Sequence, residues 1–281
     1  MATIIDGKKM ANEMRAAIKE QVQALIAQGQ QPKMAVVLVG NDPASVAYAK
    51  AKKTACEKAG IVYDLHQLPE DSTLEQVQEL VRQLNTDVSV HGIMIELPLP
   101  KHLDKEAVLP LVDPNKDLDG VTPVNKGRLM AGQDGLFPAT PQSCIEIILR
   151  SGIKLEGTET VLVGHGETVG KPLTCLLMRH LPTLTICHHM TRDLAAHTRQ
   201  ADLLIVAVGK AGLIRGDMVK PGATVVDVGI NEVDGKIVGD VRYDEAEQVA
   251  GMITPVPGGV GSVTTAIIMQ NLLKAMKLQG K

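Results

Sequence analysis

Two patterns of apolar residues alternate along the chain. Short runs rich in β-branched residues, such as residues 36–39, are typical of buried strands, whereas apolar residues at helical spacing, as over residues 8–28, indicate helices. In the first part of the chain we predict a helix over 8–28, strands over 33–39, 61–65 and 92–95, and helices beginning near residues 43, 72 and 104. Regular alternation of strand and helix is typical of an α/β layer with a parallel sheet.

The periodicity fades between residues 113 and 141, where turn-forming residues dominate. A second α/β series follows it. Here we predict helices over 140–150 and 262–277, and strands over 160–163, 183–187, 203–208, 224–228 and 252–254. The fold class is therefore α/β, with a domain boundary in the turn-rich segment.

Composition narrows the class of protein. The 281 residues are 44% hydrophobic but only 1% aromatic, so aliphatic side chains must fill the core. The net charge is −3 without a polybasic block, which argues against binding to nucleic acid or a membrane surface. No apolar run has membrane-spanning length, and no secretory signal opens the chain. The four cysteines are far apart, as expected of reduced thiols. We expect a cytoplasmic protein without a bound metal.

The segment after the strand over 33–39 carries the first candidate chemistry. Asn41-Asp42-Pro43 breaks the strand and starts a helix on which Tyr48 and Lys52 lie one turn apart, on one face. Ligands of open α/β sheets bind at this end of the strands. An aromatic ring can stack on a flat ligand, and an amine can act as a general acid or base. By itself, such a pair is also common on solvated helix faces.

A glycine-rich turn marks a candidate nucleotide site. Gly164, Gly166 and Gly170 lie between a predicted strand and a predicted helix, where glycines let the backbone approach a pyrophosphate. The spacing also suits a tight turn without a ligand. After the next strand no carboxylate precedes Asp193, so nothing obvious receives a ribose diol. Side chains that can hold a 2′-phosphate are present instead, in His165, His189 and Arg192.

Several motifs follow one another in a fixed order along the chain. They are residues 39–45 (VGNDPAS) with Tyr48 and Lys52, residues 57–61 (EKAGI), 97–100 (LPLP), 116–120 (KDLDG), 169–172 (VGKP), 226–231 (VDVGIN) and 254–261 (TPVPGGVG). Together they resemble the bifunctional methylenetetrahydrofolate dehydrogenase/methenyltetrahydrofolate cyclohydrolase family. The resemblance spans essentially the whole chain and is more specific than any single motif.

The resemblance implies two domains with a cleft between them. The catalytic folate-binding domain comprises residues 1–120 and 262–281, and a Rossmann-type NAD(P)-binding domain comprises residues 138–261. It implies oxidation of 5,10-methylenetetrahydrofolate with NADP, followed by hydrolysis of the methenyl product to 10-formyltetrahydrofolate. NAD is the alternative cofactor. It also implies a homodimer formed through the cofactor domain.

The resemblance also assigns residues to the sites. Tyr48 stacks on the folate, Lys52 is the cyclohydrolase acid/base, and Asp119 holds the pterin. Glu96 completes the catalytic group. Further substrate contacts are Ile95, Leu97, Pro257, Gly258, Gly259, Val260 and Gly261. The cofactor contacts are Gly164, His165, Gly166, Val169, His189 and Ile230.

This chain departs from the family pattern at several of these positions. Glu96 stands where the family usually has Gln, His165-Gly166 where it commonly has Arg-Ser, and His189 where it has Ser. A carboxylate beside Lys52 would favour the ammonium form and slow hydrolysis. Two alternatives therefore stay open: a monofunctional dehydrogenase, which can be NAD-dependent, with weak cyclohydrolase activity, or a silent relative that binds folate or nucleotide. The presence of Tyr48, Lys52 and Asp119 argues against the silent relative.

Overall fold

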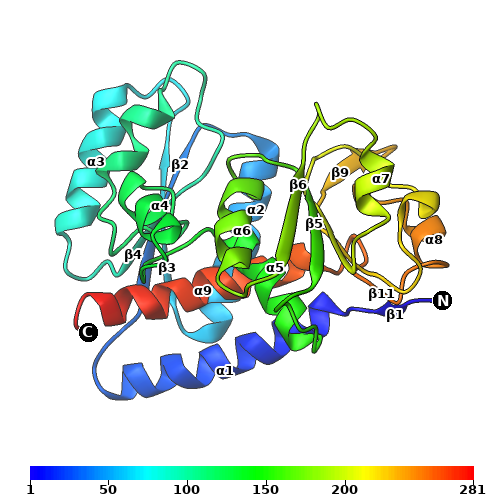
Figure 1. Ribbon diagram of the computed structural model, residues 1–281. Helices are drawn as coiled ribbons and strands as arrows, with labels where there is room; N and C mark the ends of the chain where they lie inside the picture. The colour runs from blue at the N-terminus through cyan, green and yellow to red at the C-terminus, as the bar shows by residue number, and fades with distance from the viewer. The chain divides into compact units, whose positions relative to one another are not determined.

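The computed structural model describes all residues from 1 to 281 (Figure 1). The chain packs as two compact units. One, which we call the six-stranded unit after its main sheet, comprises Met1–Asn12 and Thr140–Thr264. The other, the three-stranded unit, comprises Glu13–Ala139 and Thr265–Lys281. The chain passes from one unit to the other within helices α1 (Gly7–Ala27) and α9 (Val260–Leu278) and at the start of α5 (Ala139–Arg150).

The three-stranded unit is built on a parallel sheet in the order β3-β2-β4. Its strands are β2 (Lys33–Val39), β3 (Val62–Leu68) and β4 (Gly92–Ile95), connected by α2 (Pro43–Ala59) and α3 (Leu74–Thr86). A backbone bridge between Ile93 and Asp117 continues the sheet beyond β4. The rest of the unit contains two 3₁₀ turns, Lys105–Ala107 and Leu109–Leu111, and helix α4 (Pro123–Met130).

The two faces of this sheet bury different side chains. Alternate β2 residues such as Val37 join a core cluster with Val77 and Val81 of α3, which lies beside the sheet in Figure 1. The intervening residues point to the other face, toward α2, where Cys56 Sγ lies 3.5 Å from Met34 Sδ. Because successive strand residues alternate between faces, each side chain at the end of β4 faces either α3 or α2.

Local sequence signals set the ends of α2. The Asp42 carboxylate accepts a hydrogen bond from Ser45 N at 2.8 Å, and Pro43 occupies the first turn. Gly60 ends the helix in the left-handed conformation, with φ at 87°. A capping acid, a proline in the first turn and a terminal glycine are common signals of helix ends, and the predicted start near residue 43 is confirmed.

The six-stranded unit contains a parallel sheet in the order β1-β11-β8-β7-β5-β6. Its strands are β1 (Thr3–Ile4), β5 (Glu159–Val163), β6 (Thr183–Cys187), β7 (Leu203–Val206), β8 (Thr224–Asp227) and β11 (Met252–Ile253). The helices between them are α6 (Gly170–Met178), α7 (Leu194–Thr198) and α8 (Tyr243–Ala246), with a 3₁₀ turn at Gly216–Met218. Strands β9 (Asn231–Val233) and β10 (Lys236–Val238) form a separate antiparallel hairpin.

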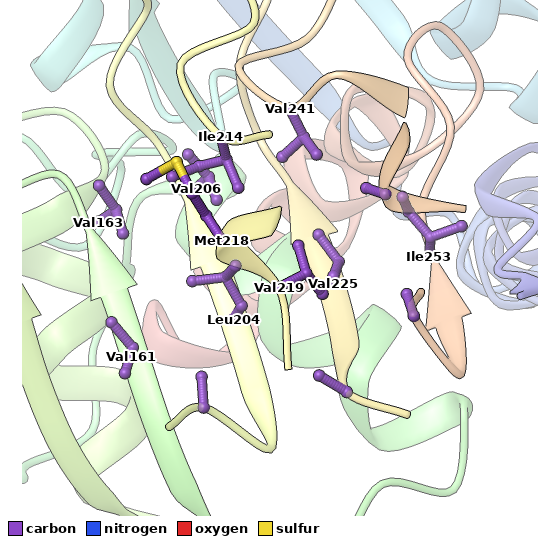
Figure 2. Close-up of a cluster of buried hydrophobic side chains, with 14 of the residues drawn as sticks. Val161, Val163, Leu204, Val206, Ile214, Met218, Val219, Val225, Val241 and Ile253 are labelled. Atoms are coloured by element: carbon purple, nitrogen blue, oxygen red, sulfur yellow. The ribbon is translucent and has the colours of Figure 1, made fainter. Parts of the chain in front are cut away.

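One face of the six-stranded sheet is covered by an aliphatic cluster (Figure 2). Side chains such as Val161 of β5, Leu204 of β7 and Val225 of β8 pack there against Ile214 and Met218 from the segment before β8. Aromatic rings contribute little to this cluster, as the composition predicts. The cluster supports the strands whose carboxyl ends carry the glycine turn.

Four features differ from the sequence prediction. The helix predicted to begin near residue 104 is instead the pair of 3₁₀ turns at Lys105–Ala107 and Leu109–Leu111. The first residues form β1, which pairs with β11, so residues 1–12 belong to the six-stranded unit, whereas we had assigned residue 1 onward to the folate-binding domain. Helix α4 and the β9–β10 hairpin were not predicted. Each of these elements is short, with too few residues for a periodic signal. None of the helices is both long and apolar enough to cross a membrane.

Candidate active site and cofactor site

Lys52 and Glu96 form a buried ion pair in the three-stranded unit. Lys52 Nζ lies 2.5 Å from Glu96 Oε1 and 3.7 Å from Met94 Sδ. The two charged residues are 8% and 6% exposed. Glu96 Oε1 accepts no aligned hydrogen bond, so the contact is close in distance but not ideal in angle. The site therefore holds an amine against an acid in a place from which most solvent is excluded.

The pleat of β4 explains why Glu96 faces Lys52. Ile93 and Ile95 belong to the core cluster on the α3 side, so Met94 and Glu96 face the α2 side. Glu96 N donates to Val37 O at 2.9 Å, which continues the strand pairing by one residue. The Ile95 side chain is thus packed in the core, away from Lys52. Leu97, the next predicted contact, is 44% exposed.

Asp119 is the third ionisable group near this pair. It follows the bridge at Asp117, whose buried carboxylate accepts hydrogen bonds from Thr122 N at 2.9 Å, Thr122 Oγ1 at 2.7 Å and Asn125 Nδ2 at 2.9 Å. These bonds hold the turn that carries Asp119. Part of Asp119 stays accessible, but burial of its carboxyl raises the pKa to about 7. Lys52 opposes this shift, while the charges of Asp117 and Glu96 add to it.

Tyr48 lies one turn before Lys52 on α2, as the spacing predicted. It is 56% exposed, in contrast to the buried lysine. An exposed phenol beside a buried ion pair leaves a ring face available to a ligand. The structure thus places Tyr48 and Lys52 on one helix, and the charges of Lys52 and Glu96 act on Asp119.

Tyr63 is a neighbour of this site that the sequence analysis missed. It pairs with Met34 in the β2–β3 register and is 8% exposed, and its hydroxyl has no hydrogen-bond partner. Burial and the nearby Glu96 charge raise its pKa. Strand alternation alone could have placed Tyr63 on the buried face, but its proximity to Glu96 depends on the register of three strands.

The glycine turn of the six-stranded unit is shaped by close backbone contacts. A Cβ at Gly164 would lie 2.1 Å from Ala207 O, and one at Gly170 would lie 2.2 Å from Gly164 O. A Cβ at Gly166 would meet nothing within 4 Å, so the turn is open there. No side chain caps the N-terminus of α6 at Val169. Pro172 has no N–H and Lys171 N donates to Gly166 O at 3.0 Å, so the open backbone around Gly166 is the part of the turn that fits the pyrophosphate of a dinucleotide.

Two histidines and an arginine lie at the ends of β5 and β6, next to this turn. Val163 pairs with Cys187, so the segments that carry His165 and His189 leave the sheet side by side. Both histidines are exposed, as is Arg192. The first carboxylate after β6, that of Asp193, accepts a hydrogen bond from Ala196 N at 3.2 Å and caps α7. That oxygen therefore serves as the cap of α7.

The predicted substrate loop at residues 257–261 lies in the six-stranded unit. A Cβ at Gly7 would lie 2.2 Å from Gly259 O, so α1 begins in close contact with this loop. Ile230, a predicted cofactor contact, is 52% exposed, and its Cδ1 lies 3.4 Å from the Cβ position of Gly261. The loop and the predicted cofactor residue are thus neighbours. No group of three or more His, Cys, Asp or Glu side chains is arranged to hold a metal ion.

Comparison with known proteins identifies two domains of one family. Residues 5–119 match the model of the tetrahydrofolate dehydrogenase/cyclohydrolase catalytic domain. Residues 138–280 match the model of the NAD(P)-binding domain of the same family. The two matches together cover most of the chain, so the fold and site define a folate-linked oxidoreductase with an NAD(P)-binding domain.

Individual relatives match over their full length. The chain is 56% identical over 281 residues to bifunctional protein FolD 2 of Desulfitobacterium hafniense, covering 100% of this chain and 99% of that one. The crystal structure of the bifunctional FolD enzyme of Campylobacter jejuni superposes with a TM-score of 0.97 at 42% identity, covering 99% of this chain and 100% of that one. The Trypanosoma brucei FolD structure, complexed with NADP and an inhibitor, superposes with a TM-score of 0.94 at 34% identity, covering 100% of this chain and 99% of that one.

The chain belongs to the tetrahydrofolate dehydrogenase/cyclohydrolase family. It is an enzyme with these two activities, and the predicted family and two-domain α/β fold are confirmed. The silent relative and the monofunctional dehydrogenase are the less supported alternatives.

Proposed function

We propose that this enzyme oxidises 5,10-methylenetetrahydrofolate with NADP and hydrolyses the methenyl product to 10-formyltetrahydrofolate. The choice of NADP rests on the side chains that lie at the end of β6 and beside the glycine turn. Asp193, the first carboxylate there, is used as a helix cap, while His165, His189 and Arg192 are exposed beside the glycine turn. Cationic side chains bind a 2′-phosphate, and a free acid would repel it.

In this proposal the glycine turn holds the pyrophosphate. Gly164, Gly166 and Val169 contact it at the start of α6, and Ile230 contacts the nicotinamide end. NADP, when bound, supplies a hydride acceptor. The residues of the chain bind and orient it, and the positive end of the α6 helix dipole favours its negative charge.

In the three-stranded unit, Tyr48 stacks on the folate and Asp119 binds the pterin. With a pKa of about 7, Asp119 exists in both forms near neutral pH, so it can donate or accept a hydrogen bond. Lys52 acts in hydrolysis by taking a proton from the attacking water. Glu96 Oε1 lies 2.5 Å from its amine. From the family resemblance we also assign folate contacts to Leu97, to the backbone of Ile95 and to the loop of residues 257–261.

The same resemblance leads us to propose a homodimer, formed through the six-stranded unit, that works in the cytoplasm. In that sheet β6 is an edge strand that is only partly covered. Sedimentation equilibrium at micromolar concentration tests the dimer.

The Lys52→Ala variant tests the assignment of the two chemical steps. We expect it to lose cyclohydrolase activity by about 100-fold or more, the range typical of a general acid–base group, and to keep measurable hydride transfer. Two spectrophotometric assays separate the steps, one with methylenetetrahydrofolate and NADP and one with methenyltetrahydrofolate alone. Lys53→Ala, an exposed neighbour, is the control. Unchanged hydrolysis in Lys52→Ala would exclude Lys52 as the acid/base.

The pH dependence of cofactor preference tests the NADP site. Imidazole loses its charge across about pH 6 to 8, so the preference for NADP over NAD should weaken as pH rises. The measurement is the ratio of kcat/KM for the two cofactors at several pH values, in the parent and in His165→Ala. A ratio that stays flat in the parent would assign phosphate recognition to Arg192 or to uncharged groups.

A further inference from the structure

Two buried carboxylates lie at the carboxyl edge of the six-stranded sheet, outside every site described so far. Asp227 is the last residue of β8, and Asp240 follows β10. They are 3% and 0% exposed. All four hydrogen bonds that Asp240 accepts come from N–H groups, not from a charged side chain. Carboxylates buried in this way are costly unless they are fully hydrogen-bonded.

Asp240 binds three successive backbone N–H groups of the loop after β7. Its Oδ2 accepts from Val208 N at 2.6 Å and from Gly209 N at 3.0 Å, and its Oδ1 accepts from Lys210 N at 2.8 Å. Converging N–H groups of this kind form an anion-binding nest. Here the anion is a side chain of the protein itself, so these three donors are not available to a ligand.

The same carboxylate also holds the loop after β8. Asn231 Nδ2 donates to Asp240 Oδ1 at 2.9 Å, and Asn231 directly follows Ile230, the proposed nicotinamide contact. A Cβ at Gly229 would lie 2.2 Å from Asp240 Cγ, so only glycine leaves room for the carboxylate there. One side chain therefore connects two loops that leave neighbouring parallel strands.

Asp227 fixes Asp240 in turn. Its Oδ1 accepts from Asp240 N at 3.0 Å and from Gly229 N at 2.9 Å, and its Oδ2 accepts from Val241 N at 2.9 Å. A Cβ at Gly239 would lie 1.9 Å from Asp227 Oδ2. The backbone on both sides of Asp240 is thus held, which leaves its carboxylate in one position.

The loop that Asp240 holds adjoins the glycine turn. The backbone of Ala207, immediately before Val208, is the group that a Cβ at Gly164 would strike, at 2.1 Å. Val208 is 40% exposed and Ile230 is 52% exposed, so both loops present surface at this edge of the sheet. The edge is where dinucleotides bind in sheets of this kind.

We propose that Asp240 is a positioning residue for the nicotinamide cofactor. It does not touch the cofactor. It fixes the loops at residues 208–210 and 229–231. It also occupies the N–H groups of the first loop, so that phosphate binding is left to the glycine turn at the start of α6. The cofactor then binds in one direction, with its phosphates at α6 and its nicotinamide toward Ile230. This inference rests on the proposed binding of the cofactor at the glycine turn.

The Asp240→Asn variant tests the proposal, because an amide nitrogen replaces one acceptor oxygen and faces N–H donors. We expect the KM for NADP to rise about 10-fold or more while hydrolysis of methenyltetrahydrofolate, which needs no cofactor, stays within about twofold of the parent. Asp234→Asn, an exposed acid in the β9–β10 turn, is the matched control and should match the parent in both assays. Hydrogen exchange of the apoprotein should show faster exchange at residues 208–210 in Asp240→Asn, and not throughout the unit.

An unchanged KM for NADP in Asp240→Asn overturns the proposal, as does an equal loss of both activities. Should Asp240→Asn fail to fold, Asn231→Ala removes only one of the four hydrogen bonds and should raise the same KM by about two- to fivefold. An unchanged KM in that variant then counts against the proposal. A parent enzyme that binds neither NADP nor NAD would instead refute the proposed function, before any variant is compared.

Discussion

At the scale of single residues, the pairing of Lys52 with Glu96 is the feature that most distinguishes this site. The carboxylate lies 2.5 Å from the amine in a buried position where the family usually has a neutral amide. A nearby anion favours the ammonium form, and an ammonium cannot accept a proton from water. The same anion can stabilise the methenyl cation as it forms. We therefore expect the pair to suit hydride transfer better than hydrolysis.

The Glu96→Gln variant should consequently hydrolyse methenyltetrahydrofolate faster at pH 7. We expect a gain of several-fold to about tenfold, with the pH–rate profile displaced to lower pH, because the anion that favours the protonated amine is removed. Glu57→Gln serves as control, because Glu57 is an exposed acid on α2, the helix that carries Lys52. An unchanged or lower rate of hydrolysis would show that Glu96 is neutral in the parent or serves another purpose.

At the scale of elements, the turn between β5 and α6 depends on two glycines for different reasons. Gly164 has φ at 121° and meets Ala207 O, whereas Gly170 opens the helix against the backbone of Gly164. Neither contact involves a flexible side chain that could move aside. The strand end and the helix start can therefore approach this closely only because neither glycine carries a Cβ atom.

The Gly170→Ala variant should lose cofactor binding because its Cβ would lie 2.2 Å from a carbonyl oxygen. We expect the KM for NADP to rise about 10-fold or more, or the unit to be destabilised by about 1–3 kcal/mol, the usual cost of overpacking. Gly127→Ala is the contrast, since its Cβ in α4 would meet nothing within 4 Å. That change should leave both activities intact and raise stability by up to about 1 kcal/mol. Equal behaviour of the two variants would contradict this account.

At the scale of the whole molecule, each unit carries a carboxyl group whose pKa is raised by burial. Asp119 reaches about 7 in the three-stranded unit, and Asp227 reaches about 6 in the six-stranded unit. A raised pKa in the folded state means that the folded protein binds the proton more tightly than the unfolded chain does. The stability gained is complete below about pH 4 and is lost as pH rises through 6 to 7.

The free energy of unfolding should therefore fall between about pH 4 and pH 8 by an amount on the order of 2 kcal/mol, after allowing for the solvent access of Asp119. His91, whose pKa is lowered by burial, acts in the opposite direction and reduces the net change. Urea titrations at several pH values measure the free energy of unfolding. The Asp119→Asn variant isolates one group, because the difference in stability between variant and parent should itself vary with pH across 4 to 8. A constant difference would mean that Asp119 has an ordinary pKa.

Most of the regular elements could be predicted from the sequence because their signals are local. Asp42, Pro43 and Gly60 mark the ends of α2 within the helix and its flanking residues, and helix spacing alone puts Tyr48 and Lys52 on one face. Val161-Leu162-Val163 followed by glycines indicates a buried strand and a turn without any knowledge of its neighbours. Such signals need only a few consecutive residues.

Contacts between distant segments were decided by the tertiary structure. The sequence does not determine how far Glu96 lies from Lys52, because that distance depends on how β4 pairs with β2 and how α2 packs on that sheet. Asp240 drew no attention in the sequence, yet it binds residues in the loops after β7 and β8 that lie 9 to 32 residues away along the chain. Side-chain type and helix face are local properties, whereas the partners of a buried charge are fixed only when strands far apart in sequence come into register.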